Sequence, residues 1–118
     1  MRIVIQQAYE RGVDGALDYL LDNGADDAAQ KLLDHAYRFL PDQLARFPRI
    51  GRIFLARNPQ IPEVQEVWDR ARELMGDDIE LREYIMGGYL ALYAIRGDTL
   101  HLLALRHHFQ SGYELGEI

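Results

Sequence analysis

The sequence predicts an α+β fold in which a helical hairpin packs on one face of a small antiparallel sheet. Three observations support this fold class. A short apolar run begins the chain, apolar residues then recur at helical spacing up to Phe47, and three strand-like runs separated by glycine turns follow residue 78. With 118 residues, of which 48% are hydrophobic, the chain has room for one domain with one core.

The first strand and the first helix are short and well separated. Residues 2–5, RIVI, form an apolar run of the kind that a first strand makes. From Gln6 onward the apolar residues follow a helical period, and Gly24 in the DNG sequence ends that helix. We expect the first strand to join the later strands at the edge of the sheet.

The second helix begins at Asp26 or Asp27, either of which is a suitable N-cap. Its apolar stripe stays in phase beyond Pro41 and continues to Phe47. Because proline removes a backbone donor, the pattern predicts a kinked or restarted helix rather than a straight one. The two helices should form an antiparallel hairpin.

The rest of the chain predicts one more helix and a three-stranded meander. Residues 58–78 contain an amphipathic helix that we interpret as an insertion, and Gly87-Gly88 and Gly97-Asp98 separate the three strands. The middle strand is apolar on both faces. This pattern predicts a central strand with helices on one side and a concave surface on the other.

Composition limits the classes of function. No apolar run is long enough to span a membrane, and there are no cysteines, so we expect a cytoplasmic protein without disulfides or thiolate metal sites. The net charge of −6 argues against a broad basic surface for duplex DNA. The four histidines lack the spacing of a metal site, and nothing indicates a cofactor.

The basic residues are distributed unevenly. Twelve of the thirteen are arginines, and ARFPRIGRIFLAR places Arg46, Arg49, Arg52 and Arg57 close together. Guanidinium groups suit bidentate contact with carboxylate or phosphate. A solvated loop paired with the surplus acidic residues is the alternative interpretation.

Two segments resemble the RelE/ParE superfamily of type II toxins, the plasmid stabilisation proteins. LARFPRIGR is similar to the loop that follows the helical hairpin in that family, and LREYIMGGYLALYAIRGDTLHLLALRHHFQ is similar to its sheet. The resemblance covers residues 1–118 except the insertion at about 58–78. It implies a single toxin domain that a cognate antitoxin neutralises by wrapping an extended segment around it, with DNA gyrase or ribosome-bound mRNA as the target.

The residues present favour the ParE-like, gyrase-binding side of the family. Cutting RNA requires an acid, a base and cations around the phosphate. Family nucleases carry Lys on the first meander strand, Arg after the Gly-Tyr pair and Arg past the last strand. The corresponding residues here are Leu81 and Glu83, then Leu90, then Phe109 and Gln110. We expect target binding by Arg49, Arg52, Arg82 and Arg106.

The alternative functions are a ribosome-dependent mRNA endoribonuclease and a non-toxic interaction domain that kept the fold. A nuclease would have to use His107, His108 or Tyr113 for proton transfer. Adjacent residues of a strand point to opposite faces, so at most one of the two histidines should share a surface with a given partner. A strand-end histidine bonded to backbone or solvent is the structural interpretation.

The remaining aromatic and basic residues have two interpretations each. Tyrosines beside arginines can stack on nucleic-acid bases, but at helix and strand spacing they more often belong to the core. This applies to Tyr37, Tyr84, Tyr89 and Tyr93. Arg82 either points into the concave face or anchors the loop after the second helix through a carboxylate.

Overall fold

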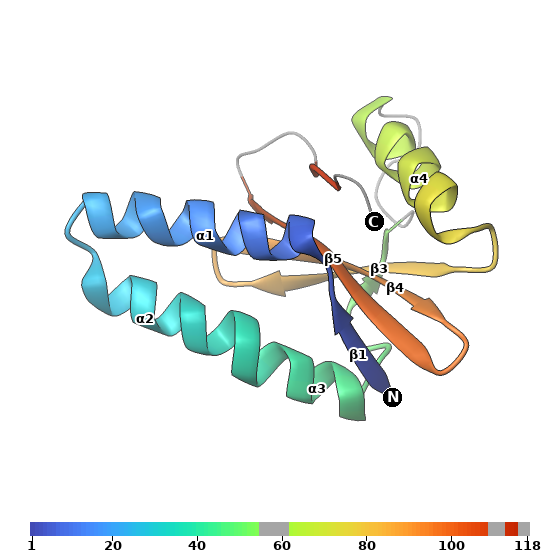
Figure 1. Cartoon of the computed structure of the whole chain (residues 1–118), viewed down its shortest axis with the longest axis horizontal. Coiled ribbons are helices and arrows are strands. Elements are labelled where there is room, and N and C mark those ends of the chain that lie inside the picture. Colours follow the sequence, from blue (N-terminus) through green and yellow to red (C-terminus); the bar gives the residue numbers. More distant parts are fainter. Residues whose placement is uncertain (55–61, 109–112, 116–118) are drawn as a thin grey trace.

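A computed structural model of the chain describes residues 1–54, 62–108 and 113–115, and it confirms the α+β fold class. The elements, in chain order, are β1 (Arg2–Ile5), α1 (Gln7–Asp22), α2 (Asp26–Asp34), the π-helical stretch η1 (His35–Phe39), α3 (Leu40–Arg46), β2 (Arg52–Ile53), α4 (Pro62–Met75), β3 (Glu80–Met86), β4 (Tyr89–Arg96) and β5 (Thr99–His107). The hairpin and α4 lie on opposite sides of the sheet (Figure 1).

The five strands form one sheet in the order β1-β5-β4-β3-β2. As predicted, β3, β4 and β5 form an antiparallel meander, and β1 joins it at the edge by parallel pairing with β5. Gly87 and Gly97 have φ angles of 61° and 60°, which glycine tolerates best, and they make the two meander turns. The short strand β2 was not predicted. It comes from the arginine-rich segment and pairs with β3.

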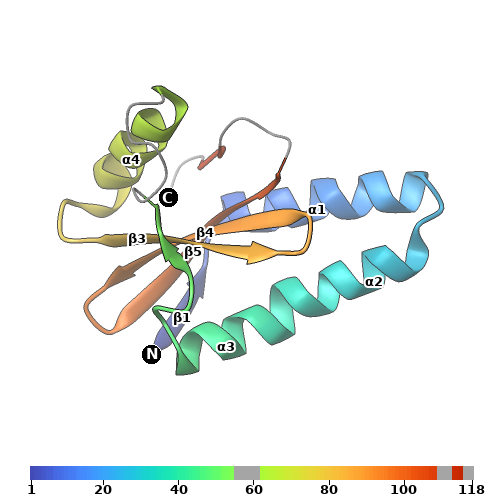
Figure 2. The ribbon, with the colours of Figure 1, turned by 180° about the vertical axis from the view of Figure 1, so that it is seen from behind.

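The second helix continues through its proline by changing its hydrogen-bond register. In a regular α-helix the ring of Pro41 would press on the carbonyl of Tyr37. The chain instead makes a π-helical stretch just before the proline, where the Leu40 N–H donates to the carbonyl of His35. The hydroxyl of Tyr9 in α1 donates to the carbonyl of Ala36 at 2.8 Å. The predicted irregularity is therefore a π-helical stretch, and α1 lies alongside the helical run from α2 to α3 (Figure 2).

The sheet has a packed core on each face. On the hairpin side, Tyr9, Val13 and Leu40 pack against Tyr93 and Leu102. The core on the other side is formed by α4, the sheet, the C-terminal segment and Phe54, which follows β2. Its buried members include Val64, Val67, Ala71, Leu90, Leu92, Ala94, Tyr113 and Leu115. The prediction of a concave surface on this second face of the sheet is therefore wrong, because α4 covers it. The apolar face of α4 requires a partner, and the second apolar face of β4 supplies it.

Among the helices in the described ranges, none is long and apolar enough to cross a membrane.

Candidate functional site

The carboxylate of Glu83 lies at the centre of a buried polar cluster on the α4 side of the sheet. Glu83 is fully buried in β3. Its Oε1 accepts hydrogen bonds from Arg52, at 2.8 Å from Nε and 2.6 Å from Nη2, and its Oε2 accepts one from the Tyr113 hydroxyl at 2.6 Å. Both carboxylate oxygens are therefore used within the chain. The cluster joins β2, β3 and the C-terminal segment.

Arg106 and Tyr113 extend this cluster. The Arg106 guanidinium lies over the Tyr113 ring, 5.0 Å from its centroid, and Arg106 is buried. The ring of Tyr113 also meets Phe54 edge-on at 6.2 Å. Burial, and after it the nearby Glu83 carboxylate, raise the pKa of Tyr113 well above its usual value. Tyr113 is thus a buried hydrogen-bond donor, an environment that does not suit proton exchange with a substrate.

Arg82 anchors the arginine-rich loop on the hairpin side. Its Nη1 donates to the carbonyls of Gly51 at 2.6 Å and Arg49 at 3.2 Å, and its Nε donates to Glu80. Glu80 also forms an ion pair with Arg49 at 3.1 Å. Arg82 therefore anchors the loop, as one of its two interpretations predicted, but it does so through backbone carbonyls, and the carboxylate that it binds belongs to its own strand.

Tyr93 provides a second anchor for the same loop. Its hydroxyl accepts a hydrogen bond from the Gly51 N–H at 2.9 Å and donates to the carbonyl of Pro48 at 2.8 Å. A Cβ on Gly51 would lie 2.7 Å from that hydroxyl, so a larger residue would displace the loop. Tyr93 is fully buried, as the core interpretation predicted; Tyr37, Tyr84 and Tyr89 are half-buried and pack against the same core.

His107 and His108 share one surface, contrary to expectation. Their rings stack with centroids 4.5 Å apart. The expected alternation fails because β5 ends at His107, and the chain then turns so that the backbone N–H and Nδ1 of His108 both bond to the Gly88 carbonyl at 2.9 Å. The His107 ring meets Tyr89 edge-on at 5.4 Å.

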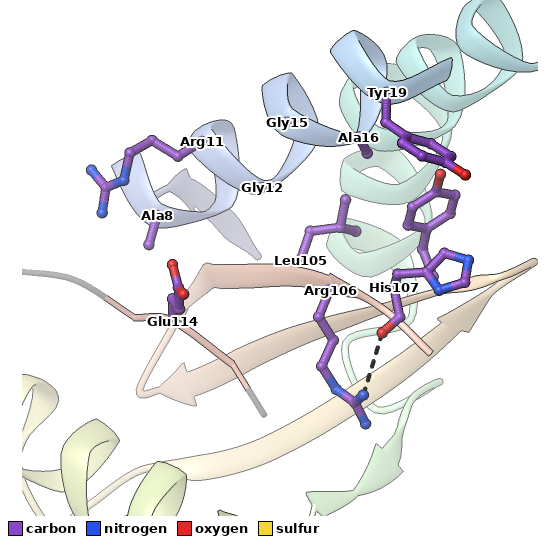
Figure 3. A pocket seen from close by; sticks show the side chains of 11 residues that line it. Ala8, Arg11, Gly12, Gly15, Ala16, Tyr19, Leu105, Arg106, His107 and Glu114 are labelled. Atoms are coloured by element: carbon purple, nitrogen blue, oxygen red, sulfur yellow. Dashed lines mark hydrogen bonds between the residues drawn. The ribbon is translucent and has the colours of Figure 1, made fainter. Parts of the chain in front are cut away.

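A groove of about 720 Å³ separates α1 from the end of β5. Its lining comes from one stripe of α1 and from the end of the sheet: Ala8, Arg11, Gly12, Gly15, Ala16, Tyr19, Tyr89, Leu105, Arg106, His107 and Glu114. Tyr19 and His107 lie at one end and Arg11 and Glu114 at the other, while the Arg106 guanidinium points away from α1 (Figure 3). A Cβ on Gly12 would lie 2.6 Å from the Leu105 carbonyl oxygen. Glycine therefore allows α1 to approach β5 at the floor of the groove.

The predicted site residues do not converge on one place. His107 lines the groove on the hairpin side, while Arg52 and Tyr113 meet at Glu83 on the α4 side. Arg49 and Arg82 belong to the loop network. Phe109, Gln110 and Arg57 lie outside the described residues.

Sequence reasoning did not predict the buried polar cluster around Glu83. The available signal was a carboxylate in a strand where its neighbours on the same face, Leu81 and Ile85, are apolar. Within the part of the chain that the structure describes, no three His, Asp or Glu side chains are grouped so that they could hold a metal ion.

Comparison of the sequence with models of protein families and with curated protein sequences finds no match.

Proposed function

We propose that this chain is a ParE-like toxin of a type II toxin-antitoxin system, which binds a target such as DNA gyrase and is neutralised by a cognate antitoxin. The proposal rests on the sequence resemblance. Its preference for binding over catalysis rests on one observation, the separation of His107, in the groove between α1 and β5, from Arg49, Arg52 and Arg82, which lie in the loop network and at Glu83. RNA cleavage needs both sets around one phosphate.

The α1–β5 groove is the surface that we assign to the antitoxin. The stripe from Ala8 to Tyr19 covers eleven residue steps, or about 16 Å along a helix. Tyrosine and arginine carry much of the binding energy in protein interfaces, and the groove presents Tyr19, Tyr89 and Arg11. An extended or helical segment can lie along such a groove.

The mRNA endoribonuclease is the second candidate, and the position of the histidines favours it. His107 lines the groove and stacks on His108, so an imidazole is available at a concave surface. The side chains that would complete such a site would come from the other residues that line the groove or from the bound ribosome. Arg11 is the cation of α1 at this groove.

The deciding experiment compares two activities of the purified chain. We expect inhibition of gyrase-catalysed DNA supercoiling and no cleavage of mRNA on ribosomes. Codon-specific cleavage that disappears in His107→Ala would replace the leading proposal by the nuclease. Failure in both assays, together with no growth inhibition on expression, would favour the non-toxic interaction domain.

The groove assignment has a matched pair of variants on α1. Tyr19 lines the groove, and Asp18 beside it is exposed and outside the groove. We expect Tyr19→Ala to weaken binding of the cognate antitoxin, which in a toxin-antitoxin pair is the product of the neighbouring gene, by a factor of about ten or more, and Asp18→Ala to leave it unchanged. Isothermal titration with the purified partner measures both, and equal affinities for the two variants would move the antitoxin to another surface.

A further inference from the structure

The end of α3 and the loop that follows it form a second, separate hollow. It has a volume of about 650 Å³ and is lined by Gln43, Arg46, Phe47, Pro48, Arg49 and Ile50. Phe47 is 57% exposed and Ile50 is 48% exposed. Large apolar side chains that gather at the surface mark interaction sites more often than isolated ones do. We call this surface the Phe47–Ile50 hollow.

Two accessible arginines flank the apolar part of the hollow. The side chain of Arg46 is 66% exposed and that of Arg49 is 58% exposed. Each already holds one carboxylate of this chain, Asp42 at 3.4 Å and Glu80 at 3.1 Å. Both guanidinium groups are thus positioned to bind carboxylates, and exposed pairs of this kind exchange partners at little cost.

The backbone under the hollow is held in place from below. The carbonyls of Pro48, Arg49 and Gly51 accept hydrogen bonds from Tyr93 or Arg82. A surface whose loop is already ordered loses less conformational entropy on binding than a mobile loop does. The hollow is therefore preorganised, while its side chains remain exposed.

We propose that the Phe47–Ile50 hollow binds an acidic, amphipathic segment of a partner protein. An apolar side chain of that segment packs on Phe47 and Ile50, and its carboxylates pair with Arg46 and Arg49. The hollow shares no lining residue with the α1–β5 groove, so the two surfaces can serve two partners. The inference does not depend on toxicity or on the identity of the antitoxin.

The chemistry of the hollow favours a protein segment over a nucleic acid. Phe47 is the single aromatic residue among the lining residues, whereas single-stranded nucleic acids are bound on several stacking rings and a continuous basic track. Both arginines already pair with carboxylates, those of Asp42 and Glu80, so the structure itself shows carboxylate as an anion that fits each guanidinium.

The test uses the purified full chain and fluorescein-labelled peptides. The probe alternates glutamates with leucines around one tryptophan, and its control carries lysine in place of every glutamate. We expect saturable binding of the glutamate peptide by fluorescence anisotropy and at least tenfold weaker binding of the lysine peptide. In Arg46→Glu/Arg49→Glu we expect the reverse preference, because the charges of the hollow are reversed.

Further variants and outcomes make the test decisive. Phe47→Ser should lower the affinity for the glutamate peptide at least tenfold, whereas Tyr19→Ser in the α1–β5 groove should leave it unchanged; circular dichroism melts check that both variants fold. Absence of saturable binding, equal binding of both peptides, or stronger binding of a single-stranded RNA would overturn the inference. Since no toxicity is measured, failure here leaves the proposed function standing, and failure of the gyrase assay leaves this inference standing.

Discussion

Two glutamates of β3, Glu80 and Glu83, bind arginines of the same loop region in opposite environments. Glu83 is fully buried on the α4 side and holds Arg52 and Tyr113. Glu80 lies on the hairpin side, where it stays partly exposed and holds Arg82 and Arg49. A buried charge that loses its partner remains uncompensated, whereas an exposed charge is resolvated by water. The same Arg–Glu chemistry therefore has different consequences for stability.

The first prediction concerns the removal of each carboxylate. Glu83→Ala leaves Tyr113 without its acceptor, Arg52 without its carboxylate and a space in a packed core, so we expect the free energy of unfolding to fall by about 3–5 kcal/mol. Glu80→Ala is the matched control on the same strand, with an expected loss of at most about 1 kcal/mol. Urea unfolding followed by the fluorescence of the single tryptophan, Trp68, measures both. Similar losses for the two variants would show that burial does not set how much each carboxylate contributes to stability.

The arginine partners of the two glutamates should differ in their contribution to stability in the same way. Because Arg52 binds the buried carboxylate, we expect Arg52→Ala to be clearly more destabilising than Arg49→Ala, although both side chains are partly exposed. A loss of growth inhibition in Arg52→Ala is therefore ambiguous between target binding and folding. Arg49→Ala is the better variant for a test of target recognition.

The second prediction concerns the Tyr113 hydroxyl of the buried cluster. Tyr113→Phe keeps the ring against Phe54 and Arg106 and removes only the hydroxyl that donates to Glu83. We expect a loss of about 1–3 kcal/mol, because a buried carboxylate loses one of its hydrogen-bond donors. Tyr19→Phe, at a side chain that is 68% exposed, should change the free energy of unfolding by less than about 0.5 kcal/mol. Equal effects of the two changes would show that the Tyr113 hydroxyl contributes nothing.

The third prediction is a loss of stability at alkaline pH. Burial is the largest cause that raises the pKa of Tyr9, Tyr93 and Tyr113 in the folded chain. Unfolded tyrosines lose their proton near pH 10, so above that pH the unfolded state binds fewer protons and stability falls as pH rises. The slope from each tyrosine is at most about 1.4 kcal/mol per pH unit. Tyr113→Phe should show a shallower decline than the wild type in urea unfolding between pH about 9 and about 11, and an identical decline would count against the burial of its hydroxyl.

Sequence periodicity predicted those elements whose own side chains define them. The hairpin, the helix Pro62–Met75 and the meander each carry an apolar pattern over several residues, and each was found where that pattern lies. The strand β2 has two residues and no pattern of its own, because it is defined by pairing with β3. Such an element depends on tertiary contacts that no local window of sequence contains.

The candidate site was harder to predict than the fold for the same reason. The interpretation of α4 as an insertion left its apolar stripe without a partner, and so the face of the sheet that it covers was predicted to be open. Strand alternation placed the two histidines on opposite faces, but the strand ends between them. Glu83 and Tyr113 are thirty residues apart in the sequence, and only the folded sheet brings them together.

The smallest expected effect is the contribution of Glu80 to the pH dependence of stability. The hydrogen bond from Arg82 is the largest influence that lowers the pKa of Glu80 below its usual value of 4.5, and Arg49 acts in the same direction. A lowered pKa in the folded state gives stability that is present above about pH 4.5 and is lost as pH falls through the folded value. Glu80→Gln should therefore weaken the dependence of the free energy of unfolding on pH slightly below pH 4.5, and should leave that free energy unchanged at pH 7 within about 1 kcal/mol, since the pair is solvated.

Because water screens this pair, about 1 M salt should reduce the difference in stability between Glu80→Gln and the wild type, and should leave the destabilisation by Glu83→Ala nearly unchanged. If salt changes both variants equally, burial is not what distinguishes the two carboxylates.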